Sequence, residues 1–544
     1  MILPRDPTKL LYTVLDMVRM CTSTRGTRET FYNENMAYYM QGGTDISRGR
    51  ANKVKPVVNR QASFLYAPES IKFWADVSPE EDSDENYKRS DPVSQVVSQA
   101  WTDSDLDTLF FEAVKHSRVN GCGIISVLPR PRTDGKIDLI SYNINPKYFG
   151  VLREDVNRLE RQQAVSLTNY YTIEEIEARI SRHPDRNSIF KELATATMGG
   201  ADSDVITMGP NATQFEAQYW KGGPSPYVPN TPVTYYGFYD LYCFDDDLGD
   251  WRVFTVTGNS IVWDRPISRI GIPGMLPFVK VCAEEHPEYF WGISLVDDLK
   301  KLQDWYSGKM DDMDNLIDQI LNPPTAATGM GKSYEESLAA FRKPGGQITT
   351  TSTTAKIEQF VPTMPESVFE YIKGIDALLM DQSNMRPSMF GRQEAGVRTE
   401  GMAAGLLRVA GAEMRVMGLA IEKQAQQCAQ MLFRYLRRYS PEKVVDEDGK
   451  LFSLVEFPDD ARIRVDGHSS NPLFVEDNAQ LAMGLMRYGA ITQETLVRML
   501  HPALEGKILH DLRKIQWVKV QEQTRMQLEQ QAKRSGKGKA SGSE

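Results

Sequence analysis

The chain has 544 residues, of which 41% are hydrophobic, and its formal net charge is -10. This length exceeds what one hydrophobic core organises, so we expect roughly two to four domains that mix helices and strands. The acidic balance argues against a protein that grips nucleic acid non-specifically, because such binding relies on lysines and arginines that displace counterions from phosphates. An acidic protein can still handle DNA if the DNA has to slide.

The cysteines predict neither disulfides nor a metal site. The five thiols are scattered and odd in number, and no pair has CxxC spacing. We therefore expect reduced thiols in the core of a protein made in a cytoplasm. The N-terminal stretch MILPRDPTKLLYTVLDMVRM carries Asp and Arg and predicts no signal peptide. Since no apolar run approaches the ~20 residues that span a bilayer, no membrane partner is expected.

The first part of the chain, to about residue 290, mixes helices and strands. Residues 106–128 predict a helix, a glycine turn and a strand. Residues 155–200 predict helix, most clearly at TIEEIEARISRH. Residues 197–231 are rich in Gly, Pro, Asn and Ser and predict a surface loop. The aromatic and β-branched segments of residues 232–268 predict a β-meander.

Three long helices are predicted in the second half of the chain. They span Leu295–Leu321, about 366–384 and about 400–438. Ser294 and Asp297 have capping-box spacing at the start of the first helix, and the Pro323–Pro324 pair ends it. Short strands follow Pro441, helices resume at about residue 474, and the end of the chain, KRSGKGKASGSE, predicts a disordered tail.

An acidic stripe runs along the first long helix. Its members recur every seven residues: Asp297, Asp304, Asp311 and Asp318. Such a spacing drifts by only about 20° per repeat, so the four side chains share one side of the helix. The other side carries Leu295, Leu299, Leu302, Tyr306, Met313, Leu316 and Ile320. An ordinary solvated face, partly neutralised by Lys300, Lys301 and Lys309, explains the stripe. The alternative is a ring of helices whose stripe faces an axial channel and repels DNA phosphates.

Small residues recur every seven positions along the third long helix: Ala404, Gly411, Gly418 and Ala425. Glycines inside a helix cost about 1 kcal/mol each against alanine, so close packing or a kink should offset them. Two interpretations stay open: packing against a neighbouring subunit, or burial within one chain. Because long helices leave much apolar surface for a compact monomer, we favour an oligomer.

Several stretches, in order, resemble one family. PFVKVCAEEHPEYFWGISLVDDLKKLQDWYSGKMDDMDNLIDQILNPP is similar to the segment of tailed-bacteriophage portal proteins that leaves the wing and becomes the first stem helix. NMRPSMFGRQEAGVRTEGMAAGLLRVAGAEMRVMGLAIEK looks like that family's tunnel loop and long kinked helix. VEFPDDARIRVDGHSSNP resembles its returning wing strands, and LAMGLMRYGAITQETLVRMLHP resembles the start of its crown. VKPVVNRQASFLYAPE and VNGCGIISVLP match more loosely. The resemblance covers about residues 30–520.

The resemblance implies an α+β subunit with an α/β wing, a two-helix stem, a small clip, a long kinked helix and a helical crown. The implied parts are the wing at 1–290 with an insertion at 155–231, the first stem helix at 291–322, the clip at 323–361, the second stem helix at 362–387, the tunnel loop at 388–399, the long helix and wing return strands at 400–470, the crown at 471–530 and a disordered tail at 531–544.

The resemblance also implies a function. It implies a non-enzymatic ring, normally a dodecamer, at one capsid vertex of the virion, assembled in the host bacterial cytoplasm. Double-stranded DNA would pass through its channel during packaging and ejection. The implied partners are the terminase large subunit, head-completion and tail adaptor proteins, and the major capsid and scaffolding proteins. No cofactor or metal is implied.

Three groups of residues are the candidate sites. The aspartate stripe of the first stem helix would line the channel. Phe390, Arg392, Gln393 and Arg398 of the tunnel loop would face the DNA. The basic clip residues Lys332, Arg342 and Lys343 would meet DNA or partners, or would serve only solubility.

Two other classes of function compete with a portal. A packaging ATPase or nuclease needs a phosphate loop or clustered metal-binding carboxylates. The segment at 328–333 imitates a phosphate loop, but Ala326 stands where the pattern needs glycine. The six histidines form no metal-binding motif. A different phage structural ring or neck adaptor is the other alternative, and ring symmetry would separate it from a portal.

Overall fold

The structure is a computed structural model. It describes residues 2–23, 25–44, 51–68, 71–77, 84–131, 137–181, 183–184, 186–189, 205–208, 233–321, 325–328, 356–359, 363, 366–385, 400–466, 482–489, 492–493 and 496. The chain divides into two compact units. The first comprises Met1–Ala62, Glu112–Pro129 and Ser141–Glu413, and the second Ser63–Phe111, Arg130–Ile140 and Met414–Glu544.

A six-stranded antiparallel sheet is the centre of the first unit. Its strands are β4 (Phe149–Val151), β5 (Ala164–Tyr171), β6 (Val205–Met208), β7 (Val233–Asp245), β8 (Asp250–Thr257) and β9 (Ser260–Pro266). The order is β4-β5-β7-β8-β9, and β6 pairs with part of β7. The predicted meander is confirmed as β7, β8 and β9, in which aromatic and β-branched side chains suit a pleated, buried surface.

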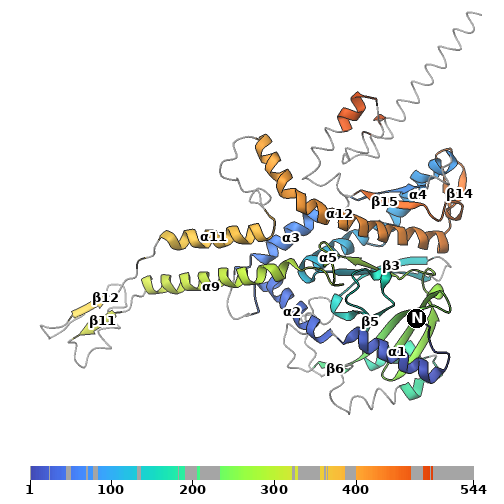
Figure 1. Cartoon of the computed structure of the whole chain (residues 1–544), viewed down its shortest axis with the longest axis horizontal. Coiled ribbons are helices and arrows are strands. Elements are labelled where there is room, and N and C mark those ends of the chain that lie inside the picture. Colours follow the sequence, from blue (N-terminus) through green and yellow to red (C-terminus); the bar gives the residue numbers. More distant parts are fainter. Residues whose placement is uncertain are drawn as a thin grey trace, which may run out of the picture. The chain divides into compact units, whose positions relative to one another are not determined.

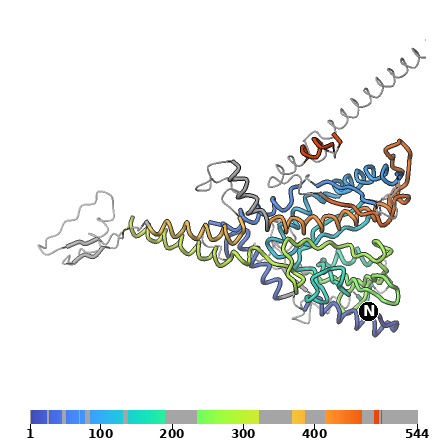
Figure 2. Tube along the Cα trace, turned by 45° about the horizontal axis from the view of Figure 1, so that its top comes forward, coloured from blue at the N-terminus to red at the C-terminus, as the bar shows by residue number. Residues whose placement is uncertain are grey.

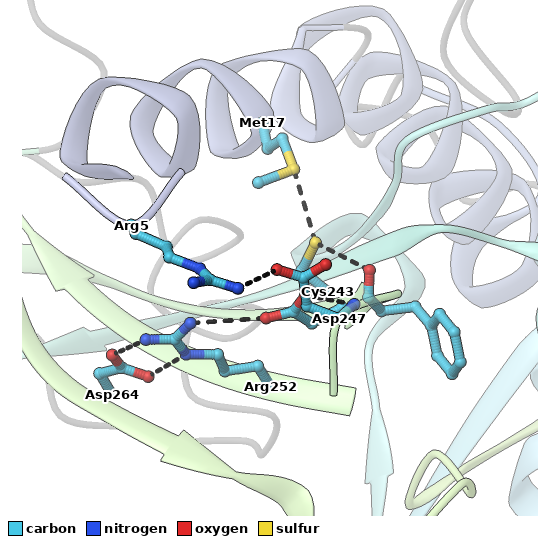
Figure 3. A network of polar contacts seen from close by, with 8 residues as sticks. Arg5, Met17, Cys243, Asp247, Arg252 and Asp264 are labelled. Carbon is cyan, nitrogen blue, oxygen red and sulfur yellow. Dashed lines mark hydrogen bonds and ion pairs between the residues drawn. The ribbon is translucent and has the colours of Figure 1, made fainter. Parts of the chain in front are cut away.

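Helix α1 (Pro7–Thr22) packs on one face of this sheet. Alternation along β7 places Tyr239, Leu241 and Cys243 in one buried cluster with Val14 and Met17 of α1. Ion pairs accompany this packing (Figure 3). Arg5, just before α1, pairs with Asp247 after β7 at 3.3 Å, and Arg252 of β8 pairs with Asp264 of β9. The N-terminal helix is therefore an integral layer of the unit.

A second core lies on the other side of the sheet. Tyr242 of β7 and Leu167 of β5 join Tyr32 of α2 (Arg25–Gln41), Phe278 of β10 (Phe278–Val281) and Trp291. Strand β10 belongs to a three-stranded sheet of order β10-β2-β3, with β2 (Gly123–Pro131) and β3 (Ile137–Ile144). The predicted helix, glycine turn and strand are confirmed as α5 (Leu106–Asn120) followed by β2. This core adjoins the start of the first long helix, because it contains Trp291.

Two long antiparallel helices extend from this core. Helix α9 (Leu295–Leu321) and helix α11 (Glu366–Gln382) run side by side in both views (Figures 1 and 2), and they make extensive contact. The short strands β11 (Thr325–Thr328) and β12 (Lys356–Gln359), which lie between these helices in the sequence, pair antiparallel. The predicted bounds of the first helix are confirmed, and the second helix ends two residues before the predicted position.

The second unit contains the later part of α12 (Glu400–Tyr439), whose predicted span is confirmed. It also holds α4 (Asp84–Asp103), the β1–β15 pair (Lys72–Asp76 with Arg462–Asp466) and the β13–β14 pair (Lys443–Val445 with Leu451–Ser453). The amide of Gln430 on α12 donates to the carbonyl of Ala461 and accepts from the amide of Ile463, which ties the helix to β15. Short strands after Pro441 are thus confirmed.

The structure settles several smaller predictions. Residues 164–171 form β5, so the prediction of helix throughout 155–200 is wrong there, because pairing with β4 and β7 overrides a mixed local pattern. Within the same span, α6 (Ile173–Ile180) is confirmed with a capping box at Thr172 and Glu175. All five cysteines are buried and free, as expected for core thiols. Gly418 and Ala425 on α12 are buried in the chain itself, which supports the interpretation of burial within one chain at these two positions.

Candidate functional site

Helix α9 carries the predicted aspartate stripe, and the turn that leads into it is sterically constrained. Gly121 and Gly292 both have positive φ, +89° and +74°. A side chain at Gly121 would lie 2.6 Å from the carbonyl oxygen of Trp291, and one at Gly292 would lie 2.5 Å from Sγ of Cys282. Only glycine fits such an approach, so the end of α5 and the turn that leads into α9 are packed backbone to backbone.

Ser294 caps α9, as the sequence predicts. Its hydroxyl accepts from the amide of Asp297 at 3.2 Å and donates to the carbonyl of Val119 at 2.5 Å. The side-chain amide of Asn35 on α2 also donates to this hydroxyl, at 3.1 Å. Asp297 does not complete the box in the described contacts, because its carboxylate pairs with Lys300 at 3.0 Å. The cap therefore joins three elements: α2, α5 and α9.

The first two aspartates of the stripe are linked to α2, Asp297 through Lys300 and Asp304 directly. Lys300, which is buried, bridges Asp297 and Glu34 with distances of 3.0 and 2.9 Å. The hydroxyl of Tyr38 donates to Asp304 at 2.6 Å, a short charge-assisted bond. The charges of this part of the stripe thus have partners within the chain.

The last two aspartates lie beyond these contacts. Asp318 is exposed and Asp311 is half-buried. Nearby, Lys309 pairs with Asp312 at 2.7 Å on the surface, where an ion pair contributes little. The stripe that looks uniform in the sequence therefore has its first two members at the base of α9, among these contacts, and its last two farther along the helix.

Helix α11 is fastened to the same region by Lys53, which precedes α3 (Val54–Leu65). Its ammonium pairs with Asp376 at 2.9 Å and lies 5.0 Å from the ring centroid of Tyr306. Its backbone amide donates to Gln303 Oε1 at 3.0 Å, and the amide of Gln303 donates to the carbonyl of Ala51. The segment before α3 therefore binds both long helices.

The carboxyl end of α11 is closed by a Schellman motif. Asn384 adopts a left-handed conformation with φ 53°, and the amide of Met385 donates to the carbonyl of Met380 at 3.0 Å. The free carbonyl of Ser383 accepts from Gln61 Nε2 at 2.5 Å. An asparagine at this position is a recognised stop signal, whereas nothing local in the sequence identifies Gln61 as its partner.

Gln61 also links α11 to a buried arginine. Arg118 Nε donates to Gln61 Oε1 at 2.9 Å, and its NH1 lies 3.5 Å from Glu284 Oε2. Burial lowers the pKa of the Arg118 guanidinium, and the charge of Glu284 opposes that shift. Burial, together with the charges of Glu284 and Asp297, raises the pKa of the nearby Asp298. Arg118 is thus held between Glu284 and Gln61, and Gln61 in turn binds the end of α11.

These contacts divide the helix pair into two halves. The base half comprises residues 295–307 of α9 and 375–382 of α11, and it contains every buried residue of α9. The distal half comprises residues 308–321 and 366–374, and none of those with described burial is buried. Large apolar side chains are exposed along the pair, mostly at or beyond the junction: Trp305, Ile317, Leu321, Phe369, Tyr371 and Leu378.

The remaining sequence-derived sites lie outside the described residues. These are the tunnel-loop candidates Phe390, Arg392, Gln393 and Arg398, and the clip candidates Lys332, Arg342 and Lys343. Most of the predicted crown and the predicted tail also lie outside them. Within the part of the chain that is described, no three His, Cys, Asp or Glu residues are placed to hold a metal ion, and no helix has the length and apolar character needed to cross a membrane.

Comparison with known proteins adds little. No protein-family model and no curated protein matches the chain. Among solved structures, one match is a chain of the "Neck of empty GTA particle computed with C6 symmetry". It is 11% identical, with a TM-score of 0.40, and the match covers 86% of this chain and 93% of that one. Since so low a TM-score does not establish a shared fold, we draw no conclusion from it.

Proposed function

We propose that the chain is the portal subunit of a tailed bacteriophage, a non-enzymatic ring component at one capsid vertex. In this proposal the six-stranded sheet and its helices belong to the wing, α9 and α11 form the stem, and the β11–β12 pair belongs to the clip. The ring, normally of twelve copies, would conduct double-stranded DNA during packaging and ejection. Terminase and, later, adaptor proteins would dock on the clip, and capsid and scaffolding proteins would surround the wing.

The observation that carries the proposal is the distal half of the helix pair. Residues 308–321 and 366–374 have no buried side chain among those described, yet they expose Ile317, Leu321 and Phe369. A two-helix projection of this kind buries too little apolar surface to be stable alone in water. Copies packed side by side in a ring would cover these side chains, and the order of segments along the chain is the order expected of a portal.

The charge on α9 supports a channel for sliding DNA. Asp311 and Asp318 lie in the distal half, beyond Asp297, which pairs with Lys300 of the same helix, and Asp304, which accepts from Tyr38 of α2. A ring would repeat their charge once per copy, and negative charge around an axis repels phosphates and prevents DNA from adhering. In this proposal the four aspartates of the stripe line the stem, and Asp297 and Asp304 in addition brace its base through Lys300 and Tyr38.

Electron microscopy of the purified full-length protein, combined with native mass measurement, tests the proposal. Rings of about twelve copies with an open central channel are expected from the family resemblance. A folded chain that stays monomeric at every salt and protein concentration would contradict it. Rings of a clearly different copy number would favour another phage structural ring or a neck adaptor, and ATP hydrolysis by the pure protein would favour a packaging enzyme.

A further inference from the structure

Two glycines lie where the base and distal halves of the helix pair meet. Gly308 follows Ser307, the last buried residue of α9. Gly374 precedes Ile375, the first buried residue of α11 among residues 367–382. Each helix thus has a glycine at the boundary between its half with buried side chains and its half without them, although the two helices are separate in sequence and run in opposite directions.

Packing within the chain does not account for either glycine. No described atom outside the helix's own nearby backbone lies within 4 Å of a Cβ built on Gly308 or Gly374. This contrasts with Gly121 and Gly292, where a Cβ would collide with backbone or sulfur. Because glycine weakens a helix interior and alanine would fit, some property other than space accounts for glycine at both positions.

Three contacts that hold the helices to other segments reach only the base half or its end. Tyr38 reaches Asp304, Lys53 reaches Gln303, and Gln61 reaches Ser383, all within the base half or at its end. The aromatic rings of Trp305 and Tyr371 meet at 5.6 Å close to the boundary. Beyond it, α9 and α11 pack on each other without burying a side chain in the part of the pair that the structure describes.

We propose that Gly308 and Gly374 form a hinge at which the distal halves of α9 and α11 tilt together while the base halves stay in place. If only one helix had a glycine, the straight neighbouring helix packed against it would prevent bending, whereas a glycine in each helix allows both to bend. The hinge requires neither DNA nor a ring. In a ring, the distal halves of neighbouring copies would tilt in concert, so that the clip could change its orientation without disturbing the wing.

Distance measurement between two spin labels tests the hinge. One label is placed at Lys9→Cys on α1, which is packed on the sheet, and the other at Gln319→Cys in the distal half; both native side chains are exposed. The five native cysteines are buried, so the new thiols react preferentially. Gln319 lies eleven positions after Gly308, so a bend of about 30° moves the second label by roughly 8 Å. Labelled full-length protein is diluted with unlabelled protein to isolate single pairs.

We expect a broad distance distribution in the otherwise native chain and a narrow one after Gly308→Ala with Gly374→Ala. Asn315→Ala, which also favours helix but leaves both glycines, is the matched control and should leave the distribution broad. A native distribution as narrow as that of the double-alanine variant would overturn the proposal, and so would a variant distribution as broad as the native one. If the folded variant fails to form rings that the native chain forms, the glycines serve close contact between copies and the hinge is wrong.

Discussion

The base and distal halves of the α9–α11 pair are parts of the same two helices, yet the chain treats them differently. The base half is bound by Tyr38, Lys53 and Gln61 and contains all buried residues of α9. The distal half displays apolar side chains and the outer two aspartates of the stripe. Helical pattern alone does not show this difference, because it depends on which residues of distant segments reach the helices.

The largest effect is expected from breaking the base at Gln61. In Gln61→Leu, both Arg118 Nε and the carbonyl of Ser383 lose their buried partner. Arg118 keeps its ion pair with Glu284, but leaving a buried guanidinium N–H and a buried carbonyl without a hydrogen-bond partner should lower the free energy of unfolding by about 3 kcal/mol. Urea denaturation measures this. Gln319→Leu in the distal half is the control and should change stability by less than about 0.5 kcal/mol; equal effects at the two sites would erase the distinction between halves.

A smaller effect is expected at Tyr38. Tyr38→Phe removes the hydroxyl that donates to Asp304 and should cost about 1 kcal/mol, since the bond is charge-assisted but only partly buried. Tyr371→Phe keeps the ring contact with Trp305 and should be nearly neutral. Thermal denaturation of the two variants provides the comparison, and a neutral Tyr38→Phe would show that Asp304 does not brace the base.

In the distal half, apolar substitutions should affect assembly more than folding. Phe369 is exposed in the single chain, so Phe369→Ser should change the unfolding free energy by less than about 0.5 kcal/mol. If neighbouring copies cover the Phe369 side chain, the protein concentration at which half of the chains are assembled should rise at least about tenfold in the variant. Mass photometry measures this concentration. Asn315→Ser, on an already polar position, is the control. Unchanged assembly by Phe369→Ser would mean that copies do not cover this face.

The smallest effect on stability is expected from the outer aspartates. Asp311→Asn with Asp318→Asn should leave unfolding within about 0.5 kcal/mol of the native value. In rings, however, removal of this charge should increase retention of double-stranded DNA at low salt, and the retention should fall as salt rises. Filter binding at several salt concentrations measures it. No change in retention would argue against these residues as the channel lining.

The sequence predicts these helices well and their anchoring poorly. The prolines at 323–324 and the cap at Ser294 delimit α9 because they act within a few residues of its ends. Local pattern predicts helix for the residues of β5, which form a strand because they pair with β4 on one side and β7 on the other. The bond between Gln61 and Ser383 joins positions far apart in the chain, and no local pattern marks either residue.

The aspartate stripe likewise depends on a distant segment that no local pattern identifies. Its period of seven identifies one side of a helix, and helical spacing brings Lys300 close to Asp297, but the period contains no information about where Tyr38 of α2 will lie. The stripe therefore identifies one side of α9, and only the folded structure shows that Tyr38 donates to Asp304.

Hydrogen exchange, followed peptide by peptide in assembled rings and in dissociated chains, tests the central claim most directly. We predict slow exchange of residues 295–307 and 375–382 in both states, and protection of residues 308–321 and 366–374 only in rings. Equal protection of both halves in the dissociated chain, or a distal half that stays unprotected in rings, would contradict the account.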